Sequence, residues 1–125
     1  MRRFVLCVAL CTVPSAGLSQ NMNAEAFYKR AMALKAKGPL ALLSGGEIQA
    51  LMTEGKASGD AARAQRIAAT NAGKPGRYCP PGSVSSMDSN EFMQRLSAIP
   101  QAERQRINMT EATTRILAAK YPCKK

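Results

Sequence analysis

The chain has 125 residues and a net charge of +10, from 18 lysines and arginines against 8 aspartates and glutamates. This length is enough for one domain with one modest core. It contains no histidine, the commonest general base and metal ligand, so we expect no enzymatic activity and no metal or cofactor site. The enzymatic alternatives are a hydrolase with paired carboxylates or with a lysine-activated serine.

Residues 1–19 have the pattern of a secretory signal peptide. Two arginines precede an apolar run over residues 4–11, and a proline and several small residues follow. The apolar run is too short to cross a bilayer about 30 Å thick, so we expect cleavage, after Ser19 or after Ala16, and no transmembrane anchor in the mature chain. The mature protein, residues 20–125, is then a single helical domain that is periplasmic or secreted.

The spacing of apolar residues is helical in four segments, and no stretch alternates long enough to indicate a strand. The first predicted helix runs from Asn23, whose side chain can cap it, to Lys37. Gly38 and Pro39 then end it. Residues 40–43 follow as a short apolar link.

The second predicted helix begins at Ser44, which has capping-box spacing to Glu47, and runs to Asn71. Gly55 and Gly59 lie four residues apart, so one face of this helix has room for the close approach of another backbone. Because each glycine costs about 1 kcal/mol in a helix, a break near them is the alternative.

Two shorter helices are predicted in the C-terminal part of the chain. One is capped by Asp88 and ends at Ile99, before a proline. Residues 101–106 form a turn, and Asn108 then caps a last helix over Met109–Lys120. The residues expected to face the core are Phe92, Met93, Leu96, Ile99, Met109, Ala112, Ile116 and Leu117.

Removal of the signal peptide would leave two cysteines, Cys79 and Cys123, which are expected to pair in an oxidising compartment. The bridge would close a loop of about 45 residues, which is worth about 4 kcal/mol in the chain-entropy model. Two free thiols for redox or metal chemistry are the alternative, but the chain has no Cys-x-x-Cys pair. Cys79 also pins the Pro/Gly-rich loop of residues 73–82. The predicted fold is all-α, a small bundle of about four helices closed by one disulfide.

The mature chain would keep 16 basic residues against 8 acidic ones, a net charge of +8, and such a field favours acidic partners. A basic cluster on and after the second helix is the candidate partner-binding site, with Tyr78 as a contact residue beside the disulfide loop. The alternatives are a solvated basic surface and a Tyr78 ring that packs over the bridge. The cluster consists of Lys56, Arg63, Arg66, Lys74 and Arg77.

The C-terminal half contains a Cys-Pro loop, a helix ended by a proline and a final helix that closes with an aromatic-Pro-Cys sequence. These are Tyr78-Cys79-Pro80-Pro81-Gly82, Ile99-Pro100 and Tyr121-Pro122-Cys123. In these features it resembles the Rap/Tai family, small periplasmic immunity proteins that protect bacteria from type VI secretion effectors. The resemblance implies a disulfide-closed helical scaffold that neutralises a toxin by binding it. The further cysteines and the Cys-rich Gly-Tyr segment that family members often carry are missing here.

These features predict an exported, non-enzymatic binding protein, an immunity-like inhibitor whose partner is an acidic extracytoplasmic protein. The alternative is a basic periplasmic stress or structural protein that interacts with anionic envelope components. Nucleic acid is not an expected partner, because so few aromatic residues accompany the basic cluster that it lacks a stacking platform for bases.

Overall fold

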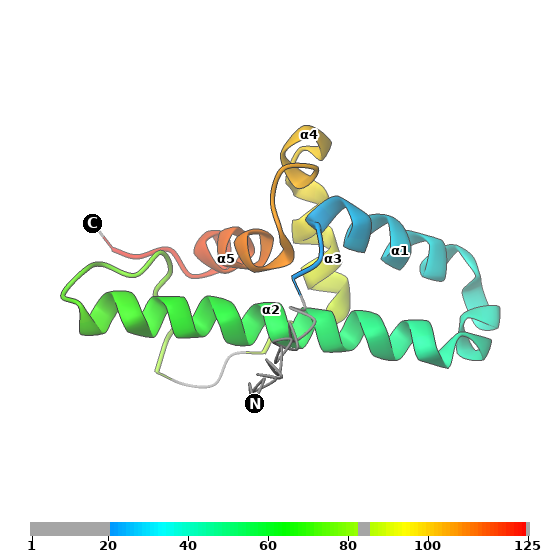
Figure 1. The fold of residues 1–125 in the computed structure, drawn as a ribbon, viewed down its shortest axis with the longest axis horizontal. Coiled ribbons are helices and arrows are strands. Elements are labelled where there is room, and N and C mark those ends of the chain that lie inside the picture. Colours follow the sequence, from blue (N-terminus) through cyan, green and yellow to red (C-terminus); the bar gives the residue numbers. More distant parts are fainter. Residues whose placement is uncertain (1–20, 83–85, 125) are drawn as a thin grey trace, which may run out of the picture.

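A computed structural model describes residues 21–82 and 86–124, and these residues form an all-α fold, as predicted (Figure 1). The long helix α2 (Gly45–Asn71) runs along the molecule, with α1 (Ala24–Ala36) over one half and α5 (Met109–Lys120) over the other. Helix α3 (Ser89–Ala98) lies between α1 and α5 and contacts both.

Two segments predicted to be irregular are short helices. Residues 40–43 belong to a 3₁₀ helix, η1 (Gly38–Leu43), and the predicted turn contains α4 (Gln101–Arg104). A proline stands at the start of each: Pro39 is the second residue of η1, where its fixed φ suits a first helical turn, and Pro100 is the residue directly before α4. The predicted signal peptide lies outside the described residues, and none of the helices within them combines the length and the hydropathy of a membrane span.

Three of the four predicted N-caps are confirmed. The Asn23 side chain accepts hydrogen bonds from the first backbone N–H groups of α1, at 3.0 and 3.1 Å. Asp88 and Asn108 each accept one from the backbone three residues later, both at 2.8 Å, at the starts of α3 and α5. Short polar side chains at these positions satisfy amides that the helix itself leaves unpaired. The predicted beginnings of these helices therefore agree with the structure.

The fourth predicted cap, at the start of α2, is wrong. The Ser44 side chain makes no capping hydrogen bond, and its backbone lies outside the extended region that a cap residue favours. Its hydroxyl instead accepts from the Lys37 ammonium at 3.0 Å, and the Glu47 carboxylate accepts two hydrogen bonds from Arg30, both at 2.7 Å. Charged donors from another element compete successfully here with the local backbone.

Helix α2 is continuous through Gly55 and Gly59, so the alternative of a break is excluded. The predicted close approach at this pair is also wrong, because a Cβ built on either glycine would meet nothing within 4 Å. Helix α5 contacts α2 instead at Ser58, whose hydroxyl lies 2.9 Å from that of Thr113. At the C-terminal end of α2, Gly73 has a φ of +72°, and the Lys74 amide donates to the Ala69 carbonyl. These contacts end α2 in a Schellman motif.

The core lies where α1, α2, α3 and α5 meet. Leu96 and Met109 are completely buried, and the rings of Phe27 and Phe92 meet edge to face with centroids 6.2 Å apart. The other buried members are Ala24, Leu51, Ala112 and Ile116. Of the residues predicted to face inward, Phe92, Met93, Ile99 and Leu117 are only half-buried.

A buried ion pair joins α4 to α1. Arg104 donates to the Glu25 carboxylate at 2.6 Å, and both side chains are less than a tenth exposed. The same guanidinium donates to backbone carbonyls at the end of α3 and lies over the Tyr28 ring, 4.1 Å from its centroid. Short helix α4 therefore serves to carry one arginine into the interface of α1 and α3.

The first described residues form a strap between distant elements. The Met22 amide donates to the Glu54 carboxylate of α2 at 2.6 Å, and the Met22 carbonyl accepts from the Met109 amide at 2.7 Å. Asn23 and Asn108 form an isolated antiparallel bridge beside them. The residues directly before α1 and directly before α5 therefore lie side by side.

The predicted disulfide is confirmed: Cys79 and Cys123 are joined, with their Cα atoms 4.9 Å apart. The Cys79 amide also donates to the Tyr121 carbonyl at 2.8 Å, so the loop and the end of the chain are joined by backbone as well. The loop before α3 and the end of α5 are therefore one covalently closed unit.

Candidate binding surface

The structure separates the predicted basic cluster into two groups. Lys56, Arg63 and Lys74 are exposed, and Lys56 forms an ion pair with Asp60 one turn later at 2.6 Å. Exposed pairs of this kind contribute little to stability, so the three side chains are available to a partner.

The other three predicted residues meet beneath the disulfide loop. Arg66 lies over the Tyr78 ring, 5.3 Å from its centroid, and both line a cavity of about 90 Å³ with Arg77. The Tyr78 residue is only 4% exposed. Its burial favours the packing role and leaves the ring out of reach of a partner in this conformation.

Arg77 is occupied by an internal partner. Its guanidinium donates to both carboxylate oxygens of Glu111 in α5, at 2.6 and 2.9 Å. These hydrogen bonds, with help from Arg115, lower the pKa of Glu111 to about 2 and raise the pKa of Arg77. This pair ties the loop to α5, so Arg77 acts first as a structural residue.

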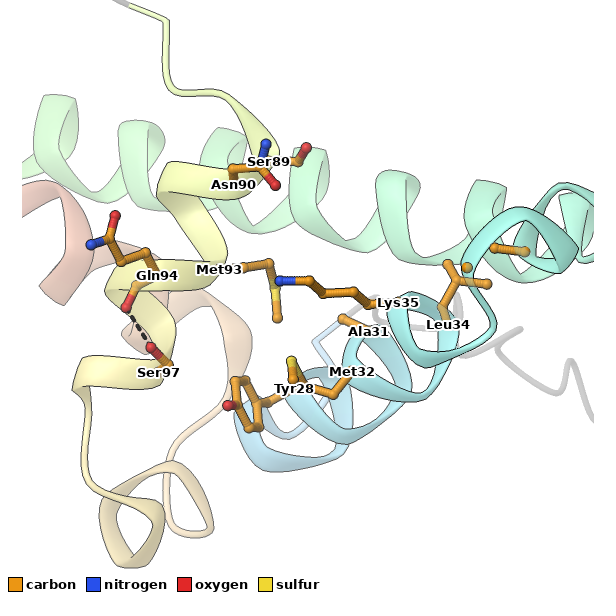
Figure 2. A pocket seen from close by; sticks show the side chains of 12 residues that line it. Tyr28, Ala31, Met32, Leu34, Lys35, Ser89, Asn90, Met93, Gln94 and Ser97 are labelled. Carbon is orange, nitrogen blue, oxygen red and sulfur yellow. Dashed lines mark hydrogen bonds between the residues drawn. The ribbon is translucent and has the colours of Figure 1, made fainter.

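A larger hollow, which the sequence did not reveal, lies between α1 and α3 (Figure 2). Its volume is about 550 Å³. Each wall is formed by residues spaced three or four apart along one helix. The residues of α1 are Tyr28, Ala31, Met32 and Lys35, and those of α3 are Asn90, Met93, Gln94 and Ser97. Helices α1 and α3 run at a steep angle to one another, so the two walls enclose a hollow that is open to an inserted side chain or segment of a partner.

A second hollow, of about 370 Å³, lies on the other side of the α1–α3 contact, against α2. It shares Ala31, Ser89 and Met93 with the first hollow, so the two are adjacent. We call them together the methionine groove, because four of the seven methionines of the chain line it. These are Met32, Met52, Met87 and Met93.

The groove is mainly apolar, and its charged lining residues are two lysines and the carboxylate of Asp88. Met32 is 41% exposed and Met52 is 67% exposed, which is unusual for side chains with so little affinity for water. Lys35 extends from α1 toward α3 in Figure 2, and Lys56 lies at the edge of the second hollow. Lys35 forms no ion pair within residues 21–82 and 86–124. An apolar segment with an acidic residue matches both properties.

The groove holds no arrangement of acid, base and nucleophile that we can assign to a reaction. Among the described residues no group of three cysteines or carboxylates is placed to hold a metal ion. The buried carboxylates have structural partners, Glu25 with Arg104 and Glu54 with the Met22 amide.

No protein-family model matches the chain, and neither the curated proteins nor the solved structures contain a significant match to it. The resemblance to the Rap/Tai family thus rests on the residues of the C-terminal half alone. The methionine groove was missed because it is made by the packing of helices far apart in sequence. The one sequence signal for it was the high methionine count in a chain of this size.

Proposed function

We propose that the protein is an exported, non-enzymatic binding protein, an immunity-like inhibitor that holds an apolar segment of an extracytoplasmic effector in the methionine groove. The observation that carries this proposal is the presence of two adjacent, mainly apolar hollows that share three lining residues and are lined from α1, α2 and α3.

Methionine suits such a surface because its long, unbranched and polarizable side chain adapts to partners of different shape. Burial of the exposed Met32 and Met52 side chains would supply hydrophobic free energy that the folded protein alone does not recover. The groove is thus a source of binding energy without any change in the core.

Electrostatic attraction would guide the approach of the partner to the groove. The excess of basic over acidic residues favours the approach of an acidic surface, and Lys35 and Lys56 place positive charge at the groove itself. The resemblance to immunity proteins supports an effector as the acidic partner to be tested first.

The first experiment is capture of a partner from envelope extract by the oxidised mature protein, followed by calorimetric titration with the purified partner. Met32→Glu and Met52→Glu place a charge in the groove and are expected to weaken binding at least about thirtyfold. Ile67→Glu on α2 is the matched control, since Ile67 is 40% exposed, close to the 41% of Met32, and lines neither hollow. Equal loss in all three variants, or in none, refutes the groove as the site.

The charge contribution is tested separately by reversing the exposed Lys56, Arg63 and Lys74 to glutamate. Arg66 and Arg77 are left intact because they hold the disulfide loop. The reversal should slow association and leave dissociation almost unchanged. An immunity-like role further requires that the partner be toxic when exported alone and harmless when this protein is exported with it. If the partner is harmless when exported alone, the inhibitor hypothesis is refuted, whereas the hypothesis of a binding protein is not.

A further inference from the structure

Three leucines of η1 project into solvent at the end of the molecule where the chain turns from α1 into α2 (Figure 1). Leu40 is 65% exposed, Leu42 82% and Leu43 85%. Leu42 and Leu43 are the most exposed large apolar side chains in the part of the chain that the structure describes. We call these three residues the leucine tip.

The local backbone explains why the leucines point outward. Gly38 adopts a φ of +54°, which turns the chain at the end of α1. Pro39 follows with a φ that suits the first turn of the 3₁₀ helix. Of the apolar residues in this turn, Ala41 lines the α1–α3 hollow and is half-buried, so the small side chain faces the protein and the large ones face away. The core does not use the leucine tip, and its exposure has no role in the fold.

The charges around the leucine tip are almost all positive. Residues 29–47 contain four cations, Lys29, Arg30, Lys35 and Lys37, and one carboxylate, Glu47, which is already paired with Arg30. A second copy of the protein would bring a surface of the same sign, so self-association through the leucine tip is disfavoured. The combination of exposed leucines and uncompensated lysines matches a surface with anionic groups on the outside and an apolar layer beneath them.

We propose that the leucine tip docks the protein on a bilayer with anionic lipids. Leu40, Leu42 and Leu43 enter the boundary between headgroups and acyl chains, and Lys37, which directly precedes η1, contacts the headgroup phosphates. The tip lies at one end of the molecule, and none of its leucines lines the methionine groove. Membrane docking therefore leaves the groove open to a protein partner, and neither activity requires the other.

The chain contains no tryptophan, which makes a single reporter possible. Leu43→Trp in the mature oxidised protein should shift its emission to the blue on mixing with phosphatidylglycerol–phosphatidylcholine vesicles, and brominated acyl chains should quench it. With pure phosphatidylcholine vesicles the shift should be much smaller. Ile67→Trp on α2 is the matched control and should remain unquenched in both. Quenching of both tryptophans alike, or of neither, overturns the proposal.

Neutral substitutions separate apolar insertion from charge. Leu42→Gln and Leu43→Gln should each lower the vesicle partition coefficient about tenfold, and Lys37→Gln, at a residue that lines neither hollow, about fivefold. Ile67→Gln should leave it unchanged. Vesicle binding that persists in the leucine variants and disappears with salt is attraction of charge alone and overturns the proposal. Leucine variants that lose a protein partner but keep vesicle binding assign the tip to that partner, which also overturns it.

Discussion

Replacing Arg104 with methionine is expected to lower the free energy of unfolding by about 3–5 kcal/mol, because it leaves the Glu25 carboxylate buried and without its cation. Both side chains of the pair are less than a tenth exposed, so water cannot replace the lost partner in the folded state. The stacking on Tyr28 and the hydrogen bonds to the end of α3 disappear with the same substitution. For a domain of this size the loss corresponds to a fall in melting temperature of at least about 12 °C.

Urea unfolding of the oxidised protein, followed by far-ultraviolet circular dichroism, measures the change. Arg106→Met is the control, because Arg106 is exposed two residues further on and has no ion pair among the described residues. The double variant Glu25→Met, Arg104→Met removes both charges and should be more stable than Arg104→Met alone. A loss below about 1 kcal/mol for Arg104→Met, or a double variant less stable than the single one, refutes the reasoning.

The remaining predictions concern the disulfide bridge, two glycines in and after helix α2, and the dependence of stability on acidic pH. Reduction of Cys79–Cys123, which are 44 residues apart, should lower stability by about 4 kcal/mol, and the oxidised protein should be lighter by two hydrogen atoms in a non-reducing mass spectrum. Gly59→Ala should raise stability by about 1 kcal/mol, since its Cβ meets nothing, whereas Gly73→Ala should lower it by a similar amount because of its positive φ. The pKa of Glu111 lies below its ordinary value of 4.5, so its ion pair stabilises the fold above pH 4.5 and is lost as the pH falls toward 2. Glu111→Gln should flatten that part of the stability–pH curve.

Specific results would contradict each of these expectations. Two freely alkylated cysteines in exported protein would remove the bridge. Equal effects of the two glycine substitutions would show that helix propensity and backbone conformation are not what distinguishes the sites. An unchanged acid slope in Glu111→Gln would assign acid sensitivity to other carboxylates.

Local signals in the sequence were enough for most of the helices. Asn23, Asp88 and Asn108 act through hydrogen bonds that span only two or three residues, so the sequence contains both partners of each contact. The prediction of a cap at Ser44 failed because the Ser44 hydroxyl bonds to Lys37, seven residues earlier at the end of α1, and not to the backbone of α2. The disulfide was predictable because only two cysteines follow the predicted signal peptide.

The sites depend on contacts that a sequence pattern does not contain. Arg104 and Glu25 are 79 residues apart, and no spacing rule connects them. The methionine groove arises where α3 contacts α1 beside α2, from residues far apart in the sequence. In the predicted basic cluster, Arg77 is already neutralised by Glu111, a partner 34 residues away. Charge counts predict the field of a protein better than they predict which cations are free.

The strap at Met22 has a consequence for the order of folding. Its carbonyl pairs with the Met109 amide, and the Ala24 amide pairs with the Ile107 carbonyl, so the start of α1 needs residues more than eighty positions later in the chain. Closing so long a loop costs entropy before any contact repays it, and contacts of this kind form slowly. In pulse-labelled hydrogen exchange during refolding, the Ala24 and Met109 amides, which donate these two hydrogen bonds, should therefore gain protection after the interior amides of α2 and α5. The strap at the start of the domain is thus expected to form only after the long helix and the last helix that it joins.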